Sequence, residues 1–215
     1  MYIIYVGMGS ASAGLGNKHQ QRTEATRKKL LKSARRVFAR DGFEASRIED
    51  IAADAGHTRG AFYANFDSKE DLFFALLEQQ AGERINKMQQ SLESCSTDEE
   101  RLAALRDYYV GLSRDRQWSL LMLEFKLFAL RHGQLRPKLL RTHRQIRASL
   151  TVRKIKQLLP CEVANTMMTR ESVPRALEAT LHALVLEHAY DPTAVSEEQA
   201  ITFLGQIFDV LVKPF

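Results

Sequence analysis

Acidic and histidine side chains are the residues of this sequence that could bind a metal or move a proton, and their spacing gives no catalytic pattern. Glu178 and His182 are four residues apart, but the second Glu/His motif that a di-metal site in a helical bundle requires is missing. Asp54 and His57 are separated by a predicted glycine turn, which does not suit a shared metal. Residues 98–215 contain no HExxH motif and no glycine-rich phosphate loop. We therefore expect no catalytic residue, no metal and no cofactor, and we expect that the protein is not an enzyme.

Arginine and lysine side chains could instead hold a polyanion, and they are concentrated in one quarter of the chain. Twelve basic and eight acidic residues lie between Lys18 and Glu70, a net charge of +4 against +5 for the whole sequence. This excess is the electrostatic footprint expected of a protein that binds a phosphate backbone. Lys28, Lys32 and Arg36 can also be interpreted as a solvated face that acts only through its charge.

Composition predicts a mostly helical protein from a reducing compartment. Hydrophobic residues make up 45% of the 215 residues, and only 11 glycines and 5 prolines interrupt the apolar pattern. The two cysteines, Cys95 and Cys161, lack the spacing of a zinc or redox motif, so we expect reduced thiols and a cytoplasmic location. No stretch is long and uncharged enough for a membrane helix, so we expect no membrane partner.

Residues 1–17 differ in composition from the rest and predict a flexible tail, or a segment upstream of a start at Met8. The run YIIYV followed by Gly7-x-Gly9 is typical of the start of a dinucleotide-binding turn. Ser12 stands where the third glycine is needed, however, and no βαβ unit follows. The opening residues also lack the basic region of a secretory signal.

The basic quarter predicts three helices, followed by a fourth that extends beyond it. From about Arg22 an apolar stripe of helical period begins, made of Leu30, Ala34, Val37 and Phe38. Gly42 predicts its end, Ser46 with Glu49 predicts a capping box for a second helix, and Gly56 predicts the end of that helix. Thr58 is the expected N-cap of a third helix over 59–65, and Ser68 of a fourth that reaches about residue 92.

The segment from Ile51 to Gly60 meets the demands of a helix-turn-helix. Ala52 and Ala55 are small enough for two helices to approach closely, and Gly56 allows the tight turn. Arg59, Gly60 and Ala61 then open the third helix with little bulk except one guanidinium, as a helix that enters the major groove requires.

These positions resemble the DNA-binding domain of the TetR (tetracycline repressor-like) family. The motifs that carry the resemblance, over about residues 22–73, are Thr26-Arg27, Ala34-x-x-x-Phe38, Gly42-Phe43, Asp50-Ile51-Ala52, Ala55-Gly56-x-Thr58-Arg59-Gly60-Ala61-Phe62-Tyr63-x-x-Phe66 and Lys69-Glu70-x-Leu72. The resemblance implies an all-α fold, with a three-helix DNA-binding domain, a linking fourth helix, and a helical domain for ligand binding and dimerisation. We expect a tail at 1–17, the DNA-binding domain at 18–70 and the second domain at 71–215.

The expected DNA contacts come from the second and third helices and the residues beside them. They are Ser46, Arg47, Thr58, Arg59, Gly60, Ala61, Tyr63, Asn65 and Lys69. Arg59 is the candidate for a base contact and Tyr63 for a phosphate contact, although Arg59 could be a solvated charge and Tyr63 simple core. Arg47 and His57 depart from the family pattern, which has Thr or Ser and an apolar residue there, and both leave the operator sequence open.

Five further helices are expected at about 98–114, 117–131, 135–159, 172–190 and 196–212. Large apolar side chains beside a few polar groups predict a ligand pocket in the region 98–159, lined by Trp118, Met122, Phe125, His143 and Arg147. Ordinary core packing is the alternative for each of these residues.

The last two helices carry more apolar residues than one exposed hairpin can hide. We therefore expect a four-helix dimer interface that includes Leu177, Leu181, Leu184, Val185, Leu204 and Phe208.

Together these features predict a homodimeric, one-component transcriptional regulator that binds a palindromic double-stranded DNA operator. The favoured interpretation is a repressor that a small lipophilic or aromatic effector, of unknown identity, releases from DNA. The alternative is a ligand-independent dimeric DNA-binding protein with a filled core. An internal cavity with polar anchors would favour the first.

Overall fold

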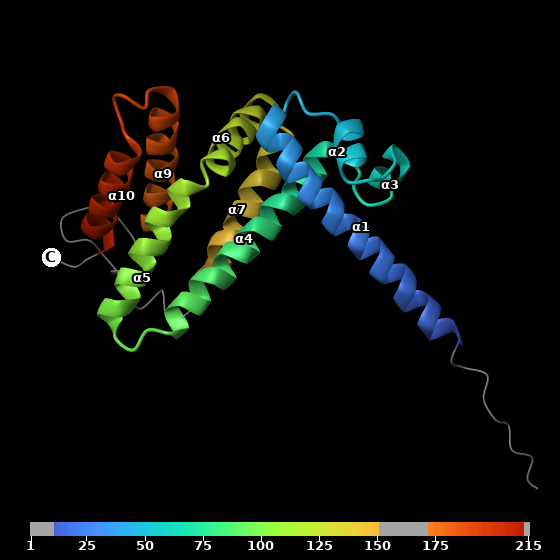
Figure 1. The fold of residues 1–215 in the computed structure, drawn as a ribbon, viewed down its shortest axis with the longest axis horizontal. Helices are drawn as coiled ribbons and strands as arrows, with labels where there is room; N and C mark the ends of the chain where they lie inside the picture. Colours follow the sequence, from blue (N-terminus) through green and yellow to red (C-terminus); the bar gives the residue numbers. More distant parts are fainter. Residues whose placement is uncertain (1–10, 151–171, 213–215) are drawn as a thin grey trace, which may run out of the picture. The chain divides into compact units, whose positions relative to one another are not determined.

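The computed structural model describes residues 11–150 and 172–212, with side chains described for residues 20–146, 148 and 172–212. The elements in these ranges are all helices, and no strand occurs among them (Figure 1). The all-α fold expected from the sequence is confirmed.

The chain divides into two compact units. The first unit comprises the chain up to residue 41 together with residues 45–76. The second unit comprises residues 42–44 together with the chain from residue 77 onward. The loop between the first two helices therefore contributes three residues to the second unit. The division at 76/77 lies inside the fourth helix, a few residues beyond the predicted boundary at 70/71.

The first unit contains α1 (Ala11–Asp41), α2 (Ile48–Asp54), α3 (Arg59–Tyr63) and the beginning of α4 (Lys69–Glu93). The predicted apolar stripe of α1 forms its core: Leu30, Ala34, Val37 and Phe38 are all at most 1% exposed. Burial of each large apolar side chain stabilises the unit by about 1.5–3 kcal/mol. Phe38 packs on Phe73 of α4 with ring centroids 5.7 Å apart.

Helix α1 begins earlier than the sequence pattern suggested. Residues 11–17, expected to belong to a flexible tail, form its first turns, while residues 1–10 lie outside the described residues. Once a helix is nucleated, each further residue adds a backbone hydrogen bond at little cost, so the helix can extend beyond its buried stripe.

Most of the predicted helix ends are confirmed. Gly42 and Gly56 have φ angles of 78° and 72°, the left-handed conformation expected after α1 and α2. Thr58 Oγ1 accepts the Ala61 N–H at 3.2 Å, and Ser68 Oγ accepts the Asp71 N–H at 3.0 Å.

The predicted capping box of α2 is wrong. The N-cap residue of α2 is Arg47, one position later than Ser46, and its side chain makes no capping bond. Ser46 is instead buried, and its backbone carbonyl accepts a hydrogen bond from Lys69.

The second unit is a helical bundle. Its elements are the rest of α4, α5 (Asp98–Gly111), the 3-10 turn η1 (Leu112–Arg114), α6 (Arg116–Arg131), α7 (Arg136–Leu150), α9 (Val173–Tyr190) and α10 (Glu197–Val212). These bounds agree with the predicted helices to within a few residues, except that residues 151–159 of the fourth expected range lie outside the described residues.

The core of the second unit lies where α10 packs against α9 and α5, and α6 packs against α9 (Figure 1). Tyr109, Val173, Leu204 and Phe208 are among its buried residues. Tyr109 and Phe208 stack at a centroid distance of 5.9 Å. Within the described ranges, no helix has both the length and the apolar character needed to cross a membrane.

Candidate nucleic-acid interface and ligand cavity

The third helix presents polar groups outward and buries its aromatic anchors. Thr58, Arg59 and Gly60 are exposed at its beginning, and Tyr63 is 45% exposed one turn later. Phe62, by contrast, is fully buried and packs against Phe66 at a centroid distance of 5.8 Å. Buried phenylalanines thus fix the helix while its first turn stays accessible, which is the arrangement needed to reach base edges.

Arg59 is held in place by two neighbours on the surface of the first unit. Its Nη1 lies 2.9 Å from Glu49 Oε1 of α2, and its Nη2 donates to the Tyr63 hydroxyl at 3.4 Å. The guanidinium carbon also lies 5.5 Å from the centre of the Tyr63 ring. The hydrogen bond to Tyr63, then the charge of Glu49, raises the pKa of Arg59. The guanidinium therefore stays charged and aligned along the outer face of α3.

Three of the predicted contact residues, Ser46, Asn65 and Lys69, are not exposed and are held by hydrogen bonds within the chain. Lys69 Nζ donates to the Ser46 carbonyl at 2.8 Å, and Ser46 is 4% exposed. Asn65 Nδ2 donates to the Ala61 carbonyl at 2.8 Å. Ala61 is half-buried. These hydrogen bonds stabilise the helix-turn-helix. The predicted contact residues that remain exposed are Arg47, Thr58, Arg59, Gly60 and Tyr63.

Several basic residues of the first unit are paired with acids. Arg36 bonds to Asp54, and Arg40 forms a two-pronged pair with Asp41. A hydrogen bond from Ser33, followed by that from Arg36, lowers the pKa of Asp54. These pairs are exposed, so they are individually weak, and a phosphate can compete for the same arginines.

The loop residues that belong to the second unit pack against α6. Phe43 is fully buried, with its ring 4.8 Å from that of Phe125 and 5.0 Å from that of Phe128. The Glu44 N–H donates to Glu124 Oε1 at 3.0 Å. A Cβ at Gly42 would come within 2.9 Å of the same carboxylate, so glycine is required there by space as well as by its φ angle.

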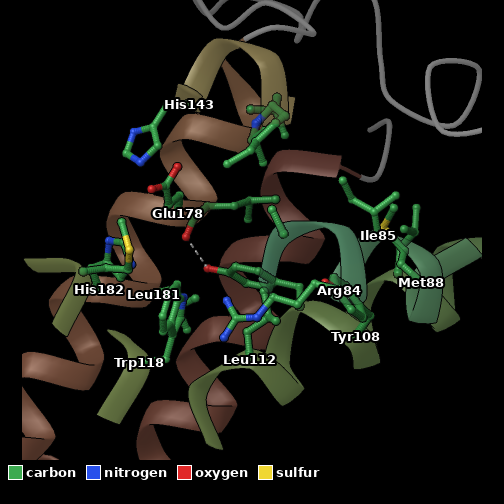
Figure 2. Close-up of a pocket in the computed structure, with 18 of the residues that line it drawn as sticks. Arg84, Ile85, Met88, Tyr108, Leu112, Trp118, His143, Glu178, Leu181 and His182 are labelled. Atoms are coloured by element: carbon green, nitrogen blue, oxygen red, sulfur yellow. Dashed lines mark hydrogen bonds between the residues drawn. The ribbon is translucent and has the colours of Figure 1, made fainter. Parts of the chain in front are cut away.

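A cavity of about 270 Å³ lies inside the second unit (Figure 2). Helices α4, α5, α6, α7, α9 and α10 all contribute to its wall. The lining residues are mostly apolar, with six polar side chains among them: Arg84, Tyr108, Tyr109, His143, Glu178 and His182. An apolar cavity with a few polar groups is the usual form of a small-molecule site.

The wall contains part of the predicted pocket. Trp118, Met122 and His143 line the cavity. Phe125 does not, because its ring is fully buried against Phe43 and Phe128. The side chain of Arg147 lies outside the described residues.

Sequence reasoning missed the contributions of α4 and α9 to the wall. Glu178 and His182 were noticed only as an incomplete metal motif. Their i, i+4 spacing places both on one helix face, next to the buried Leu177 and Leu181. Two ionisable residues on an otherwise apolar face are the signal that could have identified this wall.

A charged cluster lies at one side of the cavity. Lys126 Nζ is 2.8 Å from Glu178 Oε1 and 3.3 Å from His182 Nδ1. Burial would raise the pKa of Glu178, but the charge of Lys126 and its hydrogen bond outweigh burial and lower that pKa. Burial, then the charge of Lys126, lowers the pKa of His182 to about 4. No group of three or more potential metal ligands occurs among the described residues.

A second cation, Arg84 of α4, lies on the wall with its own counter-ion. Its Nη2 is 3.1 Å from Asp115 Oδ2, and its guanidinium carbon is 5.9 Å from the Trp118 ring centre.

Two tyrosine hydroxyls also belong to the cavity wall. Tyr109 donates to the Leu177 carbonyl at 2.8 Å, and burial raises the pKa of its hydroxyl. Burial also raises the pKa of Tyr108. Both phenols are therefore neutral hydrogen-bonding groups.

The residues predicted for a dimer interface need correction. Leu177, Leu181, Val185, Leu204 and Phe208 are at most 9% exposed within a single chain, so they form core rather than contact surface. Leu184 is half-buried and lines a shallow groove on the outer face of α9 and α10. That groove is formed by Ala179, Thr180, Ala183, Leu184, Phe203, Gln206 and Ile207. Phe203 is 44% exposed there.

Comparison with known proteins assigns the first unit. Residues 30–76 match the family model described as "Bacterial regulatory proteins, tetR family". The chain is 40% identical over 62 residues to the uncharacterized HTH-type transcriptional regulator YerO of Bacillus subtilis, covering 29% of this chain and 22% of that protein. It is 29% identical over 83 residues to the fatty acid metabolism regulator protein of B. subtilis, covering 39% and 43%. The match to the HTH-type transcriptional activator FasR of Mycolicibacterium smegmatis covers 51% of each chain at 29% identity. The chain thus spans about half or less of these curated relatives.

Solved structures share the fold over most of the chain. The transcriptional regulator FadR from B. subtilis, in complex with stearoyl-CoA, superposes with a TM-score of 0.62 at 19% identity, covering 87% of this chain and 98% of that one. A TetR transcription regulator from Haloarcula marismortui gives a TM-score of 0.65 at 17% identity, covering 87% and 98%. The helix-turn-helix residues and the family model lead to one conclusion: residues 30–76 form a DNA-binding domain of the tetR family of bacterial regulatory proteins.

Proposed function

We propose that this protein is a transcriptional regulator that binds a double-stranded DNA operator as a homodimer. The observation that carries the proposal is the first turn of α3, where Thr58, Arg59 and Gly60 are exposed and Phe62 and Phe66 beneath them are buried. In this proposal Arg59 reads a base, since arginine to guanine is the commonest specific pairing. Arg47, Thr58 and Tyr63 hold phosphates.

The remaining predicted contact residues have a supporting role in this proposal. Lys69 and Asn65 fix the backbone around the helix-turn-helix, and Ser46 receives the bond from Lys69. Gly60 and Ala61 keep the leading turn narrow enough to approach the groove.

The outer face of α9 and α10 is the surface we propose for dimerisation. Exposed apolar side chains there are Phe203 and Val210, beside the groove that contains Leu184 and Ile207. A two-fold dimer would place two third helices one or more turns of DNA apart, about 34–36 Å or a multiple of it, which matches a palindromic operator.

The cavity supports control by a small molecule that binds the DNA-free state more tightly. A filled core was the feature expected of a ligand-independent regulator, and an apolar cavity of about 270 Å³ with polar anchors favours the ligand-responsive alternative. The structural neighbour FadR is bound to stearoyl-CoA, so an acyl compound belongs among the first ligands to test. Loss of repression on ligand binding is the direction we propose.

Selection of bound fragments from genomic DNA, followed by sequencing, tests the DNA-binding proposal. We expect enrichment of one inverted-repeat sequence by the full chain. The double variant Arg59→Ala, Tyr63→Ala should lose that enrichment, and the control Lys87→Ala, an exposed change on α4 outside the cavity wall, should retain it. No enrichment above background by the unaltered chain would contradict the proposal.

A further inference from the structure

The polar groups on the cavity wall identify the kind of molecule that the cavity accepts. We infer that it binds an uncharged, largely apolar molecule that presents a hydrogen-bond acceptor to the Nε2–H of His182. The inference rests on the function proposed above, in which this cavity receives a small molecule. It depends on the contacts of His182 and on the pairing of the charges around it.

Lys126 fixes the position of the hydrogen on the His182 ring. Its Nζ lies 3.3 Å from Nδ1 of His182, and an ammonium group has hydrogens to donate but no lone pair with which to accept. Nδ1 must therefore be the acceptor. Because the low pKa of His182 keeps the ring neutral near pH 7, its single hydrogen is on Nε2.

The Nε2–H of His182 is a donor on the wall of an apolar cavity. Within the part of the chain that the structure describes, Nδ1 is the ring nitrogen that has a protein partner. Nε2 is not among the fully buried atoms that lack a partner, and the side chain of His182 lines the cavity. A hydrogen bond from this donor is gained only when the ligand supplies an acceptor. The hydroxyl of Tyr109 does not compete, because it already donates to the Leu177 carbonyl.

The charges around the cavity favour an uncharged ligand. Glu178 is paired with Lys126 at 2.8 Å and Arg84 with Asp115 at 3.1 Å, so each of these four charges has a counter-ion within the chain. A carboxylate ligand would approach Glu178, and an ammonium ligand would approach Lys126 and Arg84. Either ion would meet a like charge and would have to displace a counter-ion that the chain already supplies from a partly buried pair, so an uncharged ligand is favoured.

The position of His182 also sets the orientation of the ligand. In Figure 2, His182 and Trp118 lie toward one side of the cavity, and Ile85 and Met88 lie toward the other. We therefore place the acceptor end beside His182 and the apolar body toward Ile85 and Met88. Ketones, esters, lactones and aryl ethers have this form.

Four matched eight-carbon compounds test the inference: 2-octanone, octane, octanoate and octylammonium. Trp118 is the single tryptophan of the sequence and lies on the wall, so its fluorescence reports binding of each compound at pH 7.5. We expect 2-octanone to bind about five- to tenfold more tightly than octane, the value of one neutral hydrogen bond. Octanoate and octylammonium should both bind more weakly than 2-octanone.

Variants of His182 test whether this residue is the source of the preference for 2-octanone over octane. His182→Phe keeps an aromatic ring and removes the donor. The affinities for 2-octanone and octane should then become about equal, while octane still binds. His182→Gln restores an N–H group and should recover part of the preference, which keeps the test valid if the phenylalanine variant is unstable. His188→Phe, the same change on α9 outside the cavity wall, should leave the preference intact.

Equal affinity for 2-octanone and octane, or a ketone preference that survives His182→Phe, would overturn the inference. Tightest binding by octanoate or octylammonium would also overturn it. Ketone-selective binding that does not release operator DNA supports this inference and instead contradicts ligand control in the proposed function. Failure of all four compounds to bind, while the chain still selects its operator, counts against the cavity ligand but leaves the DNA-binding proposal standing.

Discussion

Arg59 and Tyr63 lie one helical turn apart on α3, yet we expect different losses when each is altered. Arg59→Ala should cost about 1–3 kcal/mol of operator binding and relax base preference at one position, because it removes a base contact. Tyr63→Phe should weaken all sequences alike, because it removes a phosphate donor. Footprinting and binding titrations on the operator and on single-base variants distinguish the two. Unchanged operator affinity of Arg59→Ala would refute its assignment.

In the proposed complex, Glu49 is the acid that competes with DNA for Arg59. Its carboxylate lies 2.9 Å from the arginine Nη1, and it would also lie near the phosphates. We expect Glu49→Gln to strengthen operator binding, by about twofold to fivefold at low salt, with the gain declining as salt screens the charges. Titrations at two salt concentrations measure this. A loss of affinity would mean that Glu49 positions Arg59 instead of restraining it.

His182 makes stability depend on pH. Its pKa is about 4 in the folded chain against 6.5 ordinarily, and the groups that face it are Lys126, Glu178, His143 and Arg84. As the pH falls from 6.5 toward 4, the unfolded chain takes up a proton that folded His182 does not. Stability should therefore fall across this window, by at most about 3 kcal/mol, and the contribution should level off below pH 4.

Urea unfolding at intervals between pH 7 and pH 5 checks this sign, because the carboxylates still stay ionised there. The slope should be shallower in His182→Gln than in the unaltered chain. Equal slopes in the two proteins would show that His182 takes its proton equally in both states.

At the scale of single residues, the sequence predicted the local helix-start signals but not which distant residues would pair with each other. The hydroxyl of Thr58 and the small residues around Gly60 determine a helix start by themselves, so both could be predicted. The contact of Lys69 with the Ser46 carbonyl spans 23 residues, and the pair of Lys126 with Glu178 spans 52. Such partners depend on how helices pack, which no local pattern encodes.

At the scale of elements, α9 and α10 each have two apolar faces with different uses. Phe208 faces the core at 3% exposure, whereas Phe203 is 44% exposed on the outer groove. We expect Phe203→Glu to yield a folded monomer, since two charges would meet across a two-fold interface. Sedimentation at low micromolar concentration measures the change.

Two further variants serve as references for the interface. Leu130→Glu, an exposed leucine of α6, should leave the dimer intact. Phe208→Ala should lower the free energy of unfolding by about 3–5 kcal/mol, because it opens a cavity in the core. A Phe203→Glu protein that remains fully dimeric would locate the interface elsewhere.

The residues predicted for the dimer interface show what the sequence could not predict about α9 and α10. Periodicity correctly gave the two helices and their apolar content, and the apolar excess indicated a second buried surface. It could not separate Leu204 and Phe208, which face inward, from Phe203 and Ile207, because all four lie within six residues. The direction of each face is set by packing against α5 and α6.

For the whole molecule, the proposed ligand control requires that ligand and DNA weaken each other's binding by the same free energy. If 2-octanone lowers operator affinity by some factor, operator DNA must lower 2-octanone affinity by that factor. A ligand at 100 times its Kd should also stabilise the chain by about 2.7 kcal/mol, visible as a rise in Tm. Titrations in both orders measure the two factors. Unequal factors would mean that more than one site binds the ligand.

The cavity could be located only in part from the sequence. Trp118, Met122 and His143 stood out by type, but Arg84, Leu177 and Phe208 are ordinary helix residues until six helices are brought together. Whether a core is filled depends on small differences in packing volume, which composition does not reveal.

The loop at residues 42–44 decides how this protein can be recombined with its relatives. Phe43 is buried among Phe125 and Phe128, although helices of the other unit precede and follow it in the chain. A hybrid that joined residues 1–76 to a foreign sensor half would carry Phe43 and Glu44 without the partners that bury and bond them. We therefore expect an exchange of halves with a protein of the same fold to succeed only when the recipient offers an aromatic pocket to Phe43 and a carboxylate to Glu44.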